Sequence, residues 1–357
     1  MGKRINTAKW DEKQKRWKIN VQKDGERKSF YSSVSGRTGQ REANAKADMW
    51  LDEGILSSRQ KISQLYEQFQ TDTEIVVKTS MRRQIESFGK VWIIPNIGKK
   101  KISSLCDQDI QHILDKAAAA GRSKKTIQDL NATINMFLKY CRRLKISTFR
   151  PEEVKIPASA RLKGKRVLQP GDLIKLLNID TTILNGKKTK EPYINAYRFE
   201  VLTGMRPGEI RGLRREDVQG KKVMIRRAIN SYGEITQGKN ENAIRSFVLS
   251  SLAEKVLLQQ LSEYDGEFIF NMPSQTVYQK HWKRYCEVNE ISRISPYELR
   301  HTFVSVVKTL PEGEVKPIVG HSQNMDTFGV YGHAIDGEDG DVAEKVNALF
   351  EKVIATK

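Results

Sequence analysis

Residues 295–333 read SPYELRHTFVSVVKTLPEGEVKPIVGHSQNMDTFGVYGH, and the rest of the chain is organised around this stretch. Among its side chains able to hold a phosphate or to react are Arg300, His301, His321, Tyr331 and His333. Apolar spacing predicts helices over residues 297–309 and 315–319. The pattern therefore puts an arginine on a helix, a histidine at a helix start and a tyrosine shortly after it. A phosphodiester attacked by a tyrosine needs groups of these kinds.

Two segments upstream carry further cations. Residues 203–213 read TGMRPGEIRGL, where Gly204 gives a tight break and Pro207 stands where a new helix would start. Arg206 is therefore expected at a rigid turn between two helices, with Glu209 packing back onto the second one. Strands are expected at 223–229, 233–237 and 245–249, and the loop before the last strand begins with Lys239.

Composition bounds the class of protein. The chain has 357 residues, 38% of them hydrophobic and 29% charged, which suits two or three ordinary globular domains. Its net charge is +19, which favours a polyanionic partner, nucleic acid before a membrane surface, over a generally basic soluble protein. No transmembrane helix or signal peptide is expected, and three scattered cysteines form no zinc or disulfide pattern. A cytoplasmic location follows as an expectation.

Residues 1–55 read as a small β-rich module. Strands are expected at 9–10, 16–21 and 27–32, with an Asp24-Gly25 hairpin turn, then a break at 36–39 and a helix over 40–51. The expected core residues are aromatic: Trp10, Trp17, Phe30 and Trp50. One sheet face is expected to bind DNA through residues that mix charge with aromatic surface: Lys9, Trp17, Lys18, Arg27 and Lys28. The alternative is a solvated basic face on a small fold.

Residues 58–155 read as a helical module. Helical patterns cover 57–66, 78–88, 102–114 and 124–144, with an interruption at 94–98. The outward face of the last helix is basic and suits the backbone of a duplex: Lys124, Lys125, Lys139, Arg142 and Arg143. An inert helical bundle explains this module equally well. Residues 149–166 contain proline and lack periodicity, which predicts an interdomain linker.

Residues 167–357 form the third module, rich in helices. Its final segment, residues 341–354, has an apolar face that either packs on its own domain or docks onto a neighbouring subunit.

Five segments, taken in order, resemble the signature segments of the tyrosine recombinases: TGMRPGEIRGL, TQGKNENAIRSFVL, YELRHTF, VGHS and VYGH. Their spacings are similar to those of the family. Together with the two modules that precede them, they resemble the phage and integrative-element integrases over essentially the whole chain. The ordered combination is specific, although no single segment is.

The resemblance implies a multidomain α+β fold. An arm-type DNA-binding domain with a three-stranded β-sheet and a helix would occupy residues 1–55, and an all-α, SAM-like core-binding bundle residues 58–155. A mainly α catalytic domain with a small antiparallel sheet would occupy residues 167–357.

The resemblance also implies roles for single residues. Tyr331 is the expected nucleophile, giving a 3′-phosphotyrosine, and Arg206 and Arg300 the expected phosphate-binding pair. Lys239 matches the lysine that protonates the leaving 5′-oxygen, although its loop is a residue or two longer than usual, and Lys221 and Lys222 are weaker alternatives.

The histidine positions need more care. His321 matches the residue that hydrogen-bonds the scissile phosphate. The family often has histidine where this chain has Tyr297, which can donate a hydrogen bond but cannot act as an imidazole near neutral pH. Tyr297 is therefore given a positioning role and the general base stays open. His301, His333 and Glu209 are expected to orient or support the site. No group has metal-ligand spacing, so chemistry without metal or cofactor is expected.

The expected partners are double-stranded DNA with core-type and arm-type sites, a homotetramer, and possible directionality and host DNA-bending proteins. Three alternatives stay open. They are a recombinase that resolves chromosome dimers, a type IB topoisomerase, and a DNA-binding protein without catalysis.

Overall fold

The computed structural model describes residues 5–23, 26–52, 60–161, 164–236, 244–320 and 338–355. Four residues assigned roles above lie outside these ranges: Lys239, His321, Tyr331 and His333. So does the Asp24-Gly25 turn. The chain divides into two compact units, Met1–Lys163 and Gly164–Lys357. No helix within the described ranges is long and apolar enough to cross a membrane.

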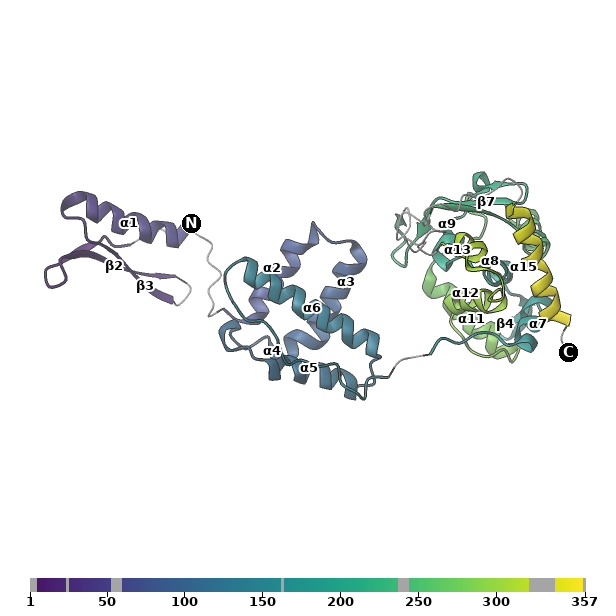
Figure 1. The fold of residues 1–357 in the computed structure, drawn as a ribbon, viewed down its shortest axis with the longest axis horizontal. Coiled ribbons are helices and arrows are strands. Elements are labelled where there is room, and N and C mark those ends of the chain that lie inside the picture. The colour runs from purple at the N-terminus through teal and green to yellow at the C-terminus, as the bar shows by residue number, and fades with distance from the viewer. Residues whose placement is uncertain are drawn as a thin grey trace. The chain divides into compact units, whose positions relative to one another are not determined.

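The first unit begins with an antiparallel sheet in the order β1-β2-β3, formed by β1(Lys9–Asp11), β2(Arg16–Lys23) and β3(Glu26–Ser32). Helix α1(Gly36–Asp52) packs on one face of this sheet (Figure 1). The buried core is made mainly of small and aliphatic side chains: Ala8, Ile19, Val21, Ala43, Ala47, Trp50 and Leu51. Trp17 and Phe30 are only partly buried against this core. Trp10 packs edge-on against Trp17 and is not part of this core, so the prediction that it is a core residue was wrong.

The predicted break at residues 36–39 is also wrong, because α1 already begins at Gly36. Gly36 has a left-handed backbone with φ of 71° and open space beside it, whereas Gly39 is needed for packing. A Cβ on Gly39 would lie 1.7 Å from the carbonyl oxygen of Val34 and 2.7 Å from the Trp17 ring. Only glycine lets the first turn of the helix come so close to the sheet.

The helical bundle follows with α2(Ile62–Glu74), α3(Thr79–Phe88), α4(Ile94–Ile97), α5(Asp107–Ala119) and α6(Lys124–Arg143). The predicted interruption at residues 94–98 is wrong, because a π-helical turn over Gly89–Ile93 joins α3 directly to α4. Tyr66 packs against Gly89, where a Cβ would lie 2.4 Å from its ring, and donates a hydrogen bond to the Ile85 oxygen at 2.9 Å. A π turn of this kind commonly marks a place where a helix accommodates a neighbouring group.

Most of the expected linker belongs to the bundle. Phe149, Val154 and Ile156 pack against its core. The amides of Glu152 and Glu153 donate to Oδ2 of Asp107 at 3.2 and 3.0 Å. The sequence predicted a linker here because the segment has no periodicity. Its scattered apolar residues nevertheless pack against the core of the bundle.

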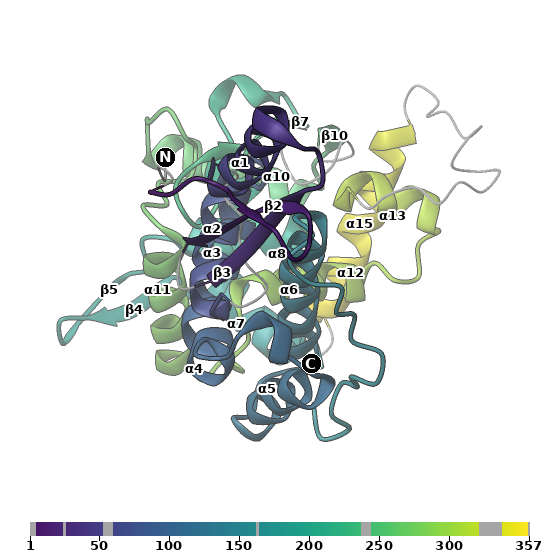
Figure 2. The same ribbon diagram turned by 90° about the vertical axis from the view of Figure 1, so that its left-hand side faces the viewer.

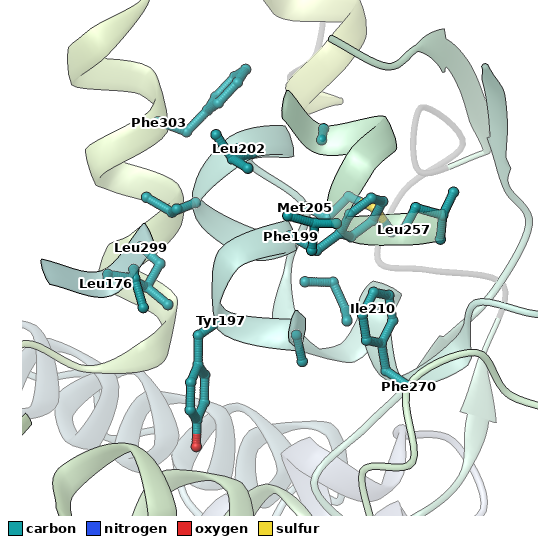
Figure 3. Packing of buried hydrophobic residues seen from close by; sticks show 14 of the residues in the cluster. Leu176, Tyr197, Phe199, Leu202, Met205, Ile210, Leu257, Phe270, Leu299 and Phe303 are labelled. Carbon is teal, nitrogen blue, oxygen red and sulfur yellow. The ribbon is translucent and has the colours of Figure 1, made fainter. Parts of the chain in front are cut away.

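The second unit is mainly helical. Its helices are α7(Pro170–Asn178), α8(Ile194–Thr203), α9(Pro207–Gly212), α10(Ser251–Glu263), α11(Gln275–Val288), α12(Pro296–Val306), α13(Glu312–Val319) and α15(Glu338–Ala355). Every residue of α8 is buried, and Figure 3 shows Tyr197, Phe199 and Leu202 of this helix among side chains from its neighbours. The core of the unit is therefore built around α8, whose C-terminal end leads to Arg206.

Small antiparallel sheets complete the unit. Strands β6(Val218–Gln219), β7(Lys222–Ile225) and β10(Arg245–Val248) pair in the order β10-β7-β6, while β8(Ala228–Ile229) and β9(Ile235–Thr236) form a separate hairpin. The strand expected over residues 223–229 is thus divided between two sheets. A further hairpin, β4(Thr181–Leu184) and β5(Lys187–Lys190), was not predicted and lies beside α11 (Figure 2). The expected α+β class with these small sheets is confirmed.

The final helix packs on its own unit. Val342, Val346 and Phe350 of α15 are buried in the core, and the Phe350 ring stacks on Phe303 with 6.1 Å between ring centroids. Of the two alternatives for this segment, the structure shows packing on its own domain.

A buried carboxyl group lies at the start of α8. Glu191 is fully buried, and its Oε1 atom lies 3.2 Å from Nδ1 of His281 on α11. Burial raises the pKa of Glu191 to about 7, although the backbone amide of Tyr193 and the charge of Arg284 act in the opposite direction. The folded chain therefore holds a proton on Glu191 at pH values where the unfolded chain has released it.

This proton makes stability depend on pH. The pKa of Glu191 rises from 4.5 to about 7 on folding, so its contribution is present below pH 4.5 and is lost as the pH rises through 7. The unsubstituted chain should therefore lose about 1–3 kcal/mol of unfolding free energy between pH 5 and pH 8 through this group. Glu191→Gln should not show this loss, because glutamine has no proton to release. Urea unfolding at both pH values measures this change. Glu344→Gln, on the exposed side of α15, is the matched control. An equal pH slope in Glu191→Gln and the unsubstituted chain would contradict the prediction.

Candidate active site

Arg206 lies in the turn between α8 and α9, as the sequence predicted. Gly204 ends α8 in the left-handed conformation with φ of 65°, and a Cβ there would lie 2.4 Å from the Phe303 ring. Arg206 is extended and Pro207 opens α9. Glycine and proline therefore fix the backbone on both sides of this arginine.

Glu209 holds Arg206 in place. The Nη1 atom of Arg206 lies 2.7 Å from Oε1 of Glu209, and its backbone amide donates to Oε2 at 2.9 Å. Its Nη2 atom donates to the carbonyl oxygen of Gly320 at 3.3 Å. The side chain keeps 29% of its surface exposed, so this guanidinium is both positioned and reachable.

Arg300 lies deeper, on α12. Only 2% of this residue is exposed, and its Nη1 and Nη2 atoms donate to the carbonyl oxygens of Gly204 and Val319 at 2.7 and 2.6 Å. Burial, followed by the nearby charge of Arg206, lowers the pKa of Arg300 to about 10, which leaves it charged at neutral pH. The two arginines predicted to act together are therefore brought together in space.

A third arginine at this site was missed. Arg245, the first residue of β10, donates from Nη1 and Nη2 to the two carboxylate oxygens of Glu209 at 3.0 and 2.9 Å. Its Nε atom donates to the Ile318 oxygen at 2.8 Å. An arginine on a half-buried strand was the available signal, since such a cation needs an acceptor. Nothing in the sequence pattern linked it to Glu209, which was expected to pack on its helix and to support the site.

Glu209 is an ionised carboxylate among three cations. Burial by itself would raise its pKa, but hydrogen bonds and charge from Arg245 and Arg206 outweigh burial and lower the pKa below its ordinary value. Within the described residues, Arg206 and Arg245 bond this carboxylate and Arg300 interacts with its charge, which leaves a net positive site. A phosphate anion is the ligand that such a charge balance favours.

Tyr297 and His301 lie on α12, one helical turn apart. Their ring centroids are 5.5 Å apart with the planes nearly perpendicular, and Tyr297 is 43% exposed. Burial and the charge of Lys165 lower the pKa of His301. Tyr297 is therefore reachable from solvent, and the His301 ring packs edge-on against it.

The strand register separates the predicted DNA-binding residues of the N-terminal sheet. Lys18 is paired with Lys9 and with Tyr31, and Arg27 is paired with Gln22, so Lys9, Lys18 and Arg27 share the face away from α1. Lys28 is paired with buried Val21 on the opposite face, and its ammonium lies 5.5 Å from the Phe30 ring centroid. Trp17 is also on that face. The expectation of one shared face was therefore wrong for Trp17 and Lys28.

The basic residues of α6 are used in different ways. Lys124, Lys139 and Arg143 are at least partly exposed, and Lys125 pairs with Asp129 at 2.8 Å. Arg142 donates to the Phe149 oxygen at 2.8 Å and so holds the segment that follows the helix. Its contribution to the fold was not foreseen.

Comparisons with known proteins show what the chain is similar to. Residues 166–338 match the sequence model of the phage integrase family. A XerC-like tyrosine recombinase of Caldanaerobacter subterraneus subsp. tengcongensis is 23% identical over 295 residues, covering 70% of this chain and 73% of its own length. The ICEBs1 integrase of Bacillus subtilis (strain 168) is 24% identical over 182 residues, covering 43% of this chain and 48% of its own.

Solved structures show the same fold. The Tn1549 transposon integrase in complex with transposon right end DNA aligns with a TM-score of 0.63 at 18% identity, over 83% of this chain and 100% of that one. A lambda integrase tetramer bound to a Holliday junction aligns with a TM-score of 0.59 at 12% identity, over 90% of this chain and 96% of that one. Residues 166–338 therefore match the phage integrase family, and the chain has the fold of the solved integrases.

Proposed function

We propose that the chain cuts DNA at specific sites and rejoins it to a second duplex, and so integrates and excises a mobile or phage DNA. The observation that carries this proposal is the convergence of Arg206 and Arg300 on the residues that directly precede His321. A DNA-binding protein without catalysis has no need for such a buried, positively charged site. The N-terminal sheet module favours an integrase over a resolver of chromosome dimers, because it offers a surface for a second class of DNA site.

In the proposed reaction, the Tyr331 phenolate oxygen attacks the scissile phosphorus. A phosphorus–oxygen bond to the tyrosine forms as the bond to the 5′-oxygen breaks, which gives a 3′-phosphotyrosine and, after protonation by Lys239, a free 5′-hydroxyl. The 5′-hydroxyl of the partner strand then attacks the phosphotyrosine and releases the tyrosine. The covalent bond conserves the energy of the broken one, so religation needs no ATP.

The phosphate is stabilised by cations of the chain in this mechanism. Arg206 and Arg300 would bind the non-bridging oxygens and stabilise the charge of the five-coordinate transition state. His321 would hydrogen-bond the same phosphate, and Tyr297 would position it or the nucleophile. Because these groups can supply the positive charge, we propose chemistry that needs neither a metal nor a cofactor.

The proposed assembly is a homotetramer that holds two duplexes and passes through a Holliday junction, as the lambda integrase tetramer was captured with one. Core-type sites would bind the helical bundle and the catalytic domain. Arm-type sites would bind the outer face of the N-terminal sheet through Lys9, Lys18 and Arg27. A directionality factor and a host DNA-bending protein would assist, and the reaction would take place in the cytoplasm, where the host DNA lies.

A suicide substrate tests the proposal. The full chain is incubated with a duplex that spans the junction of its own mobile DNA and carries a nick beside the cleavage position. Loss of the short strand traps the covalent intermediate, so a shifted band should appear in a denaturing gel. Relaxation of supercoiled plasmid without paired sites would instead indicate a type IB topoisomerase. Absence of any covalent complex on the cognate junction would refute the enzyme proposal.

The proposed role of Lys239 can be tested separately by changing the leaving group of the DNA substrate. Lys239→Ala should lower the cleavage rate by about 10²–10⁴-fold, the usual contribution of a general acid. A 5′-bridging phosphorothiolate leaves as a thiolate, which has a much lower pKa than an alkoxide and needs no proton. Cleavage of that substrate by Lys239→Ala should therefore approach the unsubstituted rate, whereas Lys222→Ala should cleave both substrates normally. Equal defects on both substrates would remove Lys239 from the acid role.

A further inference from the structure

Three consecutive carbonyl oxygens at the C-terminal end of α13 each accept a hydrogen bond from a different arginine. Ile318 accepts from Arg245, Val319 from Arg300 and Gly320 from Arg206. The last carbonyls of a helix have no partner within it and carry partial negative charge, so they attract cations. The next residue in the chain is His321. The last three carbonyls of this helix are therefore all bound by arginines of the candidate site.

Arg245 differs from the other two arginines in how it is placed. Its side chain is 7% exposed, against 29% for Arg206, and it meets Glu209 as a bidentate pair. A fork-to-fork pair fixes the plane of a carboxylate as well as its position. The same carboxylate receives both the guanidinium and the backbone amide of Arg206. Arg245 thus orients the group that orients Arg206.

The neighbouring glycine is shaped to this arrangement. Gly320 ends α13 with φ of 63°, and a Cβ on it would lie 2.8 Å from Nη1 of Arg245. Both the backbone conformation and the space require glycine at this position. In the sequence, Arg245 opens β10 six residues after Lys239.

We propose that Arg245 is a positioning residue for strand cleavage. It connects β10, which it opens, to the Arg206 turn through Glu209 and to the end of α13 through Ile318. It does not touch the phosphate in this role. It acts by holding Glu209 and the Ile318 carbonyl, so that Arg206 and the C-terminal end of α13 keep their positions during the reaction. The inference rests on the proposed function and adds a residue to its machinery.

Substitution of Arg245 should separate cleavage from DNA binding. Arg245→Gln should lower the single-turnover rate of covalent complex formation at saturating suicide duplex by about 10²-fold, the loss expected from a displacement of about 1 Å in a catalytic group. Affinity for the same duplex in a gel shift should change by less than about 3-fold, because the residue is buried and makes no phosphate contact. Arg245→Lys should be intermediate, because one ammonium cannot replace a planar fork.

Arg198 provides the matched control for loss of a buried arginine. It is 8% exposed and donates to the Leu176 and Ile179 oxygens at the C-terminal end of α7, and it makes none of the contacts that hold Arg206, Arg245 or Arg300. Arg198→Gln should lower the melting temperature as Arg245→Gln does, yet keep the saturating cleavage rate. If Arg245→Gln fails to fold, Arg245→Lys carries the test.

A double-mutant cycle with Arg206→Lys tests whether Arg245 affects cleavage through Arg206. Residues that act as one unit have strongly non-additive effects, so the double variant should cleave scarcely slower than the slower single variant. Full multiplication of the two defects, or a saturating rate for both Arg245 variants equal to that of the unsubstituted chain, would overturn the inference. Such results would leave the proposed function intact, because that fails only if the unsubstituted chain forms no covalent complex.

Discussion

Tyr331→Phe should form no detectable covalent complex with a suicide duplex, while it binds the same DNA as tightly as the unsubstituted chain does. The substitution removes one oxygen atom, the atom that would form the bond to phosphorus. Loss of a nucleophile in other enzymes that use covalent intermediates lowers turnover by about 10⁶-fold, so the expected defect exceeds the range of a gel assay. The phenyl ring keeps its size and the net charge of the chain is unchanged, which leaves binding intact.

Tyr297→Phe is the matched control, since Tyr297 is the other tyrosine that the signature segments contain. It lies 43% exposed on α12, next to His301. Its hydroxyl can contribute one hydrogen bond, so its loss should slow cleavage by about 10-fold without abolishing the covalent complex. Mapping the DNA-linked peptide by mass spectrometry would then locate the linkage at residue 331. A complex that survives Tyr331→Phe and disappears in Tyr297→Phe would reverse the two assignments.

Sequence patterns predicted the elements that carry Arg206 and Arg300, because short-range rules decide them. The turn at Arg206 follows from Gly204 and Pro207, and the α12 helix follows from its apolar spacing. The small sheets were less well predicted. The strand expected over residues 223–229 divides because β7 pairs with β10 while β8 pairs with β9, and such pairings join distant residues.

The errors share one physical cause. Glycine is required at positions 39 and 89 because each approaches a group from elsewhere in the chain. Gly39 lies against the Val34 carbonyl and the Trp17 ring, and Gly89 lies against the Tyr66 ring. Arg245 was missed for the same reason, since Glu209 and Ile318 are 36 and 73 residues away in the chain. Periodicity reports the environment of one element and carries no information about such long-range contacts.

Arg300 is expected to show the second largest effect, and its substitution separates charge from geometry. Arg300→Gln should lower the saturating cleavage rate by about 10³-fold, the upper range for removing one preorganised donor from a transition state. It should also destabilise the fold by about 1–3 kcal/mol, because the Gly204 and Val319 oxygens lose their partners inside the core. Single-turnover cleavage and urea unfolding measure the two effects independently.

Arg300→Lys decides which property of the arginine matters. Lysine keeps the positive charge, but a compact ammonium cannot reach both carbonyl oxygens and the phosphate in the planar fork of a guanidinium. Arg300 donates to the Gly204 carbonyl, in the turn that leads to Arg206, and to the Val319 carbonyl, two residues before His321. The lysine variant should therefore recover much of the stability but stay at least about 10²-fold slower in cleavage, since misplaced donors lose most of their effect on a transition state. If it instead cleaves at the rate of the unsubstituted chain, charge alone is sufficient at this position. The convergence of the three arginines on residues 318–320 would then serve folding rather than strand transfer.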